Sequence, residues 1–128
     1  MSRGRRFLTF QLPLILYLAL IFFLSSGPVP SPKLQEVPDY YLHSLEYGGL
    51  YLLMFRAIHE GFDRKPGRGG YWLPALLTIA YGVSDEFHQM FVPTRDASIA
   101  DVGSDAVGSL LGIVLLPGCR RLISVFRA

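Results

Sequence analysis

The chain has 128 residues, which is enough for one domain. Hydrophobic residues make up 51% of it and charged residues 17%, whereas a soluble domain carries about 25% charged residues, so the composition is that of a membrane protein. The net charge of +2 is small, and the single cysteine, Cys119, excludes an internal disulfide and makes a thiolate metal site unfavourable.

The first predicted helix covers residues 7–24 and follows a basic start. A secretory signal peptide has the same order of charge and apolar residues. However, the apolar core of a signal peptide is typically about 7–15 residues long and is followed by a cleavage site of small residues. The apolar run here is longer, and no such site follows it. Eighteen residues span about 27 Å as a helix, close to the thickness of the hydrocarbon core. We therefore predict a retained membrane helix in which Pro13 introduces a kink.

Three further spans are predicted at residues 41–58, 71–91 and 99–116. Proline, serine and glycine mark the connections between them, which are an extended loop over 25–38, a flexible basic loop over 61–70 and a short turn over 92–98. Residues 118–128 form a basic tail. The predicted fold is all-α, a single domain over residues 1–128 built as a four-helix transmembrane bundle.

Arginine and lysine lie almost entirely on one side of such a bundle. The N-terminus, the second loop and the C-terminus hold Arg3, Arg5, Arg6, Arg64, Lys65, Arg68, Arg120, Arg121 and Arg127. The opposite loops hold only Lys33 and Arg95. Because basic loop residues remain in the cytoplasm, we predict that both termini are cytoplasmic.

Most acidic residues fall on the other, outer side. Counting about 1.5 Å per helical residue from the cytoplasmic ends places His43, Asp85 and Asp105 at about 20–22 Å, and Glu46 lower, at about 15 Å. Three helices therefore deliver ionisable groups to nearly one level of the outer leaflet. Such residues inside a membrane usually face a bundle interior or a water-filled cavity.

This acidic layer defines the candidate site. Residues spaced by three or four share a helix face, and Gly108 and Gly112 continue the face of the fourth helix in a spacing that lets a neighbouring helix approach closely. The candidate ligand-binding or pocket-lining residues are Asp39, His43, Glu46, Tyr47, Asp85, Glu86, Gln89, Arg95, Asp101 and Asp105.

The charge balance of the layer narrows its chemistry. Arg95 and the titratable His43 and His88 are the basic residues near the layer. The carboxylates there number up to six, namely Glu46, Asp85, Glu86, Asp96, Asp101 and Asp105. Carboxylates that share a site of low dielectric cannot all ionise. The alternatives are a bound cation or a cationic group of a ligand. Oxygen donors suit magnesium or calcium, and histidine also permits zinc or manganese, although no H-E-x-x-H motif is present.

Structural explanations also apply to several of these residues. Asp101 and Asp105 lie in the first turns of a helix, where the helix dipole favours negative charge. Arg95 could form a purely structural salt bridge with Asp96 or Asp101. For Asp96 and Glu36 we favour solvent exposure, and His59 and Glu60 fit an interfacial position at the cytoplasmic end.

The spacing of these residues resembles the pattern of the VanZ-like family of small bacterial membrane proteins. The resemblance covers about residues 39–116 and rests on Asp39, His43 and Tyr47, then Asp85, Glu86, Gln89, Phe91, Pro93 and Arg95, then Asp101, Asp105 and Gly108. Two positions depart from the common form: Tyr40 stands where lysine is frequent, and Asp105 where asparagine is frequent. The resemblance implies a multi-pass protein of the bacterial inner membrane that is linked to the cell envelope. It also implies a connection with teicoplanin resistance, but no reaction.

Three functions follow as hypotheses. The first is a binding protein whose pocket recognises an envelope lipid head group or a peptidoglycan precursor. The second is an enzyme acting on a lipid head group by acid–base or metal-assisted chemistry, with His43, Glu46, Asp85 and Glu86 as candidate catalytic groups. The third is a proton- or cation-coupled transport element, which the lack of polar residues in the cytoplasmic halves disfavours.

The basic residues do not indicate a nucleic-acid partner, because membrane topology alone requires their distribution. They predict attraction to anionic lipids at the cytoplasmic face. Gly108 and Gly112 could serve a dimer as well as a contact within the chain, so the oligomeric state stays open.

Overall fold

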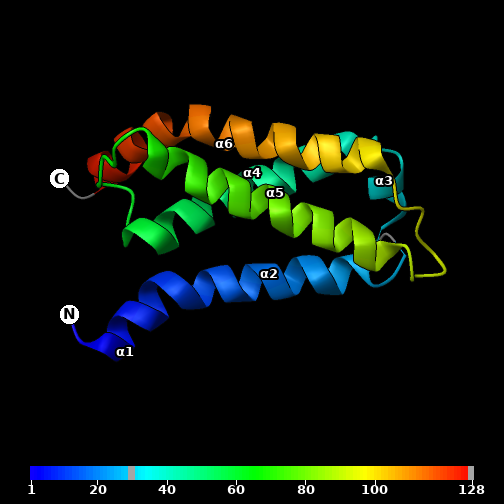
Figure 1. The fold of residues 1–128 in the computed structure, drawn as a ribbon, viewed down its shortest axis with the longest axis horizontal. Helices are drawn as coiled ribbons and strands as arrows, with labels where there is room; N and C mark the ends of the chain where they lie inside the picture. The colour runs from blue at the N-terminus through cyan, green and yellow to red at the C-terminus, as the bar shows by residue number, and fades with distance from the viewer. Residues whose placement is uncertain (29–30, 127–128) are drawn as a thin grey trace.

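The computed structural model describes residues 1–28 and 31–126, apart from the side chain of residue 34, and this part of the chain contains helices and no strand. Four long helical segments dominate (Figure 1). In chain order the elements are α1 (Arg3–Arg6), the π-helix η1 (Phe7–Gln11), α2 (Leu12–Ser25), α3 (Pro32–Gln35), α4 (Asp39–His59), α5 (Gly69–Gln89) and α6 (Ile99–Phe126).

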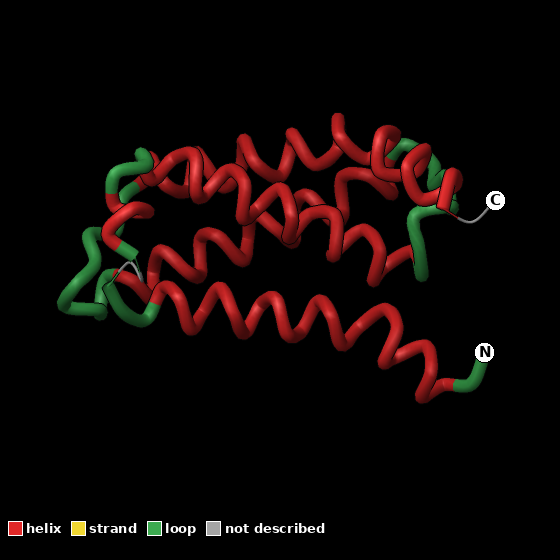
Figure 2. Tube along the Cα trace, turned by 180° about the vertical axis from the view of Figure 1, so that it is seen from behind, coloured by secondary structure: helices red, strands yellow, loops and turns green. Residues whose placement is uncertain are grey.

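The first helical segment runs without interruption through α1, η1 and α2. In η1 the backbone N–H of Leu12 donates to the carbonyl of Phe7, five residues back. Pro13 follows at once and has no N–H to donate, and a π turn is one way in which a membrane or core helix adjusts its backbone bonds next to a proline. The segment changes direction towards its N-terminus (Figure 2).

The long helices lie side by side as a bundle, with both termini at one end and α3 and the 92–98 loop at the other (Figure 1). The most extensive packing is between α4 and α6, and α5 covers both of them. The first helix packs less extensively against the others, and two of the hydrogen bonds that hold it come from tyrosines. Tyr17 donates to the carbonyl of Glu46 at 3.0 Å, and Tyr81 donates to the carbonyl of Leu18 at 2.7 Å.

The buried core consists of two clusters of apolar and aromatic side chains. One contains Tyr51, Phe55, Ala75 and Leu116, and lies towards the end of the bundle that carries the termini. The other joins the first helix to α4 through Ile21, Tyr47 and Leu50. The second cluster adjoins the acidic layer, because the ring of Tyr47 stacks on that of His43.

Large apolar side chains also cover the outside of the bundle. Those of α2, α5 and α6 include Leu16, Phe23, Trp72, Leu76, Phe87, Val107 and Val114, all well exposed. Arg3–Ser25 and Ile99–Phe126 are long and apolar enough to cross a membrane by length and composition, a test that signal sequences and core helices of soluble proteins also pass. Among the described helices, α4 and α5, which contain the spans predicted at 41–58 and 71–91, do not pass this test.

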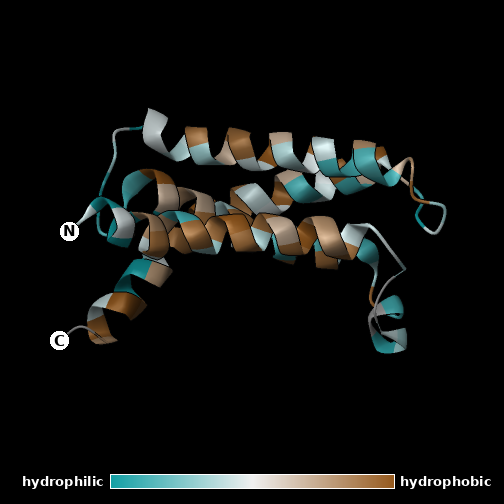
Figure 3. Ribbon diagram, turned by 90° about the horizontal axis from the view of Figure 1, so that it is seen from below, coloured by the Kyte–Doolittle hydropathy of each residue, from teal (hydrophilic) through white to brown (hydrophobic). Residues whose placement is uncertain are grey.

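The C-terminal segment differs from the prediction, because α6 continues to Phe126 instead of ending near residue 116. The last turns bend away from the rest of the helix (Figure 3), and Pro117 lies within this part of α6. Arg120 fixes the segment by donating to the carbonyls of Phe62 at 2.6 Å and Arg64 at 2.7 Å. Residues 118–126 of the predicted tail therefore belong to the last helix, and residues 127–128 lie outside the described part of the chain.

Two smaller differences concern the connections. The predicted extended loop over 25–38 contains the short helix α3, and α5 ends at Gln89, two residues before the predicted end of the third span.

The two residues predicted at an interface lie at the end of α4. His59 is half-buried, and its Nε2 lies 2.9 Å from the carbonyl oxygen of Gly70. Glu60 adopts a left-handed backbone conformation and pairs with Arg6 at 3.2 Å.

Candidate functional site

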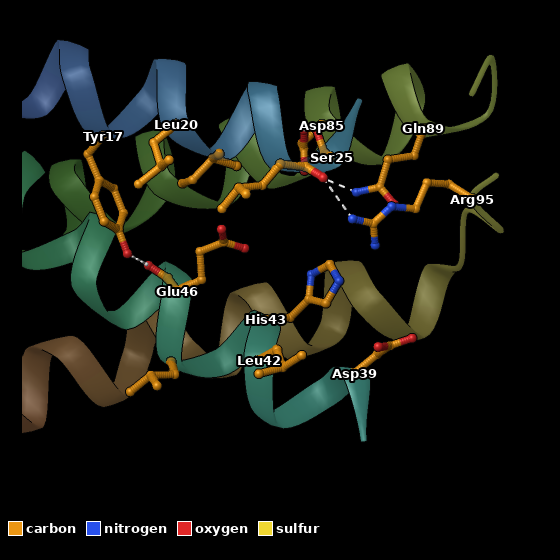
Figure 4. A pocket seen from close by; sticks show the side chains of 13 residues that line it. Tyr17, Leu20, Ser25, Asp39, Leu42, His43, Glu46, Asp85, Gln89 and Arg95 are labelled. Carbon is orange, nitrogen blue, oxygen red and sulfur yellow. Dashed lines mark hydrogen bonds between the residues drawn. The ribbon is translucent and has the colours of Figure 1, made fainter. Parts of the chain in front are cut away.

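A pocket of ≈ 380 Å³ opens between α2, α4 and α5 at the end of the bundle that is remote from the termini. Its wall is partly aliphatic, from Leu20, Ile21, Leu24, Leu42 and Leu45. Its polar lining consists of Tyr17, Ser25, Asp39, His43, Glu46, Asp85, Gln89 and Arg95. Figure 4 shows the His43 ring and the Glu46 carboxylate reaching from α4 into the space in front of α2 and α5.

Asp85 forms the floor of the pocket on the side of α5. Its carboxylate is buried and accepts two hydrogen bonds, from the hydroxyl of Ser25 at 2.6 Å and from the amide of Gln89 at 3.1 Å. Ser25 is the last residue of α2, so this hydrogen bond joins α2 to α5. The carboxylate of Glu46 has no such partner among the described side chains, and it faces the pocket.

Arg95 closes the pocket from the 92–98 loop. Its guanidinium donates to the carbonyl of Gly27 at 2.7 Å and to that of Leu24 at 2.7 Å. Leu24 lies in the last turn of α2, where backbone acceptors lack helical partners, and Gly27 lies two residues beyond the helix. In the part of the chain that the structure describes, Arg95 forms no ion pair, so the salt bridge with Asp96 or Asp101 is not observed.

A second group of titratable side chains lies behind His43. The Nδ1 atom of His43 is 2.8 Å from Oδ1 of Asp105, whose side chain is almost fully buried. Glu86 lies beside them, and its Oε2 accepts the backbone N–H of Ser98 at 3.0 Å, just before the start of α6. His43, Glu86 and Asp105 each place one potential ligand atom within 4.8 Å of the other two.

Small residues make room for this cluster. A Cβ atom on Gly82 would lie 2.6 Å from Oδ2 of Asp105. On Gly108 it would overlap the backbone oxygen of Ser44, and on Gly112 it would lie 2.5 Å from the ring of Tyr51. Gly108 and Gly112 are therefore packed against α4 of the same chain, and this close approach brings Asp105 to His43.

The sequence model of the VanZ/LLP1 family matches residues 10–123. The chain belongs to the VanZ/LLP1 family. No curated protein and no solved structure gives a significant match. The family match extends the resemblance seen in the sequence from residues 39–116 to the first helix, which supplies Tyr17 and Ser25 to the pocket.

In this VanZ/LLP1 protein, most of the predicted site residues come together in two adjoining groups. Asp39, His43, Glu46, Asp85, Gln89 and Arg95 line the pocket, and Glu86 and Asp105 stand behind His43. Tyr47 is fully buried beneath them, with its hydroxyl unpaired among the described groups. Asp101 is half-buried at the start of α6 and lies outside the pocket lining, as do the exposed Phe91 and Pro93 of the motif.

The first helix contributes residues that sequence reasoning did not select. Tyr17 and Ser25 line the pocket of this VanZ/LLP1 chain, although the composition of the segment predicts only an apolar membrane helix. Both are polar groups within an otherwise aliphatic run, Tyr17 near its middle and Ser25 just after its predicted end. That contrast is the signal from which they could have been found.

Proposed function

We propose that the chain is a four-span protein of the bacterial inner membrane with both termini in the cytoplasm, and that its pocket binds an amphiphilic envelope component with an amine-bearing head group. The exposed apolar faces of α2, α5 and α6 support the membrane location, because soluble monomers rarely expose such large apolar areas. The arginines at the end that carries the termini support the orientation.

The observation that carries the proposed ligand is the combination of an aliphatic wall with acidic groups in one pocket. Asp39, Glu46 and Asp85 lie in the lining, whereas the only guanidinium there, that of Arg95, donates to backbone carbonyls. An acyl chain suits the leucines of α2 and α4, and an ammonium group suits the Glu46 carboxylate. Lipids of the phosphatidylethanolamine type and lipid-linked peptidoglycan precursors both carry this chemistry. A lipid-linked peptidoglycan precursor as the ligand would connect the pocket with a glycopeptide response.

Native mass spectrometry of the detergent-solubilised protein tests this proposal. We expect retention of phosphatidylethanolamine in preference to phosphatidylglycerol, and a loss of at least about fivefold in Glu46→Gln, because an exposed or half-buried charge pair contributes roughly 1 kcal/mol. Glu36→Gln is the matched control, since Glu36 is exposed at the same end of the bundle and lies outside the pocket. Equal retention of both lipids by the wild type would contradict the proposal.

A host membrane lipid extract distinguishes the two sources in the same experiment. Recovery of phosphatidylethanolamine would identify a phospholipid ligand, and recovery of a pyrophosphate-linked species would identify a cell-wall precursor. The hydrogen bond between His43 and Asp105 favours a second candidate function, an enzyme acting on the head group, because a carboxylate that holds one ring nitrogen orients the other for proton transfer. Recovery of a chemically altered lipid would support that second function.

Transport receives less support from the structure. Beneath the acidic groups lie Tyr51, Phe55 and Leu116, which are fully buried and apolar or aromatic. A relay across the membrane needs a chain of polar groups or water. The proposed site is therefore a pocket that opens to one side of the membrane.

A further inference from the structure

We propose that His43, Glu86 and Asp105 form a binding site for one divalent transition-metal cation of the zinc or manganese class. The site lies behind the pocket and does not depend on the identity of the pocket ligand. Its three side chains come from α4, α5 and α6, so the cation would join the three helices that form the tightly packed part of the bundle.

The geometry requires little adjustment. The three potential ligand atoms lie within 4.8 Å of one another. With metal–ligand distances of about 2.0–2.2 Å, two donors around one ion are separated by at most about 4.4 Å. Small side-chain rotations would therefore bring all three into coordination. The backbone around them is fixed, because Gly82 and Gly108 allow no further room for movement of α6 against α5 and α4.

Unpaired buried atoms point to a missing ligand. Oδ2 of Asp105 and Oε1 of Glu86 have no hydrogen-bond partner among the described groups, although the two residues are 1% and 6% exposed. The ring of Tyr47 lies with Asp105 against Gly82, and its hydroxyl is also buried and unpaired among the described groups. Nearly all buried polar atoms in proteins have a partner. A cation held between His43, Glu86 and Asp105 would give the two carboxylates that carry these unpaired oxygens a partner.

The charge balance around the cluster gives the same result. Over the residues that the structure describes, the only ion pair of Asp105 is with His43, and the only hydrogen bond of the Glu86 carboxylate is with the backbone N–H of Ser98. Arg95, the nearest strong cation of the pocket, is engaged by the carbonyls at the end of α2. Buried carboxylates without a compensating positive charge are costly, and a divalent ion supplies that charge.

The donor set selects the class of metal. One imidazole nitrogen and two carboxylates form a mixed set of donors. Magnesium and calcium prefer oxygen donors alone, so this set suits zinc, manganese or ferrous iron better.

Metal analysis of the full chain in detergent tests the proposal. The protein is loaded with zinc or manganese chloride, passed through gel filtration and analysed by inductively coupled plasma mass spectrometry. We expect about one equivalent per chain in the wild type, and at least a tenfold weaker affinity in Glu86→Gln and Asp105→Asn. Asp39→Asn and Glu46→Gln, which change pocket carboxylates outside the cluster, should keep the metal.

A second measurement keeps the proposal testable if a variant fails to fold. Cobalt loaded into the wild-type protein should give visible d–d absorption bands that excess zinc removes. A wild-type protein that holds no stoichiometric zinc or manganese and shows no cobalt bands would overturn the proposal, as would full metal retention in folded Asp105→Asn. Lipid retention by the pocket would be unaffected by either negative result, so this failure is distinct from failure of the proposed function.

Discussion

Arg95 holds the outer loop against the first helix by binding backbone acceptors instead of a carboxylate. Two of its nitrogens donate to the carbonyl of Leu24, in the last turn of α2, and to that of Gly27, just after the helix. The planar guanidinium can reach both at once, which a lysine ammonium cannot do with the same geometry. We predict that Arg95→Lys lowers the free energy of unfolding by about 1–3 kcal/mol, the net value of a hydrogen bond that involves a charged group.

Thermal unfolding in detergent, followed by circular dichroism, measures this effect. Arg121→Lys is the control, because Arg121 is exposed on α6 and the same exchange should leave the melting temperature unchanged. An equal and small shift in both variants would show that the carbonyl contacts of Arg95 contribute little to stability.

The sequence predicts that His43, Asp85 and Asp105 lie near one another, because the rise of a helix places these three residues at nearly one depth. It did not show which of them bond to one another. The partner of Asp105 depends on the close approach of α4 and α6, and the partners of Arg95 are backbone atoms that no residue type marks. Contacts with the backbone are set by tertiary structure, so they lie beyond an argument from spacing.

The contact between α4 and α6 is the element on which the site geometry depends. Gly108 lies so close to α4 that a Cβ atom would overlap the backbone oxygen of Ser44, and backbone cannot move aside as a flexible side chain can. We predict that Gly108→Ala destabilises the protein by about 1–3 kcal/mol, as overpacking does in other tightly packed cores. It should also separate Asp105 from His43 and weaken any metal bound there.

Gly103→Ala is the matched control on the same helix, since nothing lies within 4 Å of the position that its methyl group would occupy. Alanine has the higher helix propensity, by about 1 kcal/mol, so this variant should be unchanged or slightly more stable. Urea or thermal unfolding of the two variants beside the wild type decides the matter. If Gly108→Ala were as stable as Gly103→Ala, the helices would pack less closely than the structure indicates.

At the same scale, helix lengths were predicted less well than helix positions. The apolar run of the fourth span ends near Leu116, and the hydropathy of the following residues suggests a tail. In the structure, Arg120 lies over the rings of Phe55 and Tyr71 and bonds to the 61–68 loop, which extends α6 by another ten residues. A helix held by tertiary contacts can continue beyond its apolar stripe.

For the whole molecule, the bundle brings both termini and the 61–68 loop to one end, and the pocket and the 92–98 loop to the other (Figure 1). The proposed four membrane crossings, with the basic end in the cytoplasm, would account for this arrangement, since the charge of the two ends differs as loop charge does in inner-membrane proteins. The prediction is that the 92–98 loop is exposed outside the cell membrane and the 61–68 loop inside it.

Single cysteines test this orientation in a Cys119→Ser background, which removes the only native thiol. Thr94→Cys and Gly67→Cys place one thiol on each loop, at positions that are exposed in the structure. A membrane-impermeant maleimide should label Thr94→Cys in intact spheroplasts and Gly67→Cys only after permeabilisation. Labelling in the reverse order would place the pocket on the cytoplasmic side. Labelling of both thiols in intact spheroplasts would mean that α5, which joins the two loops, does not cross the membrane.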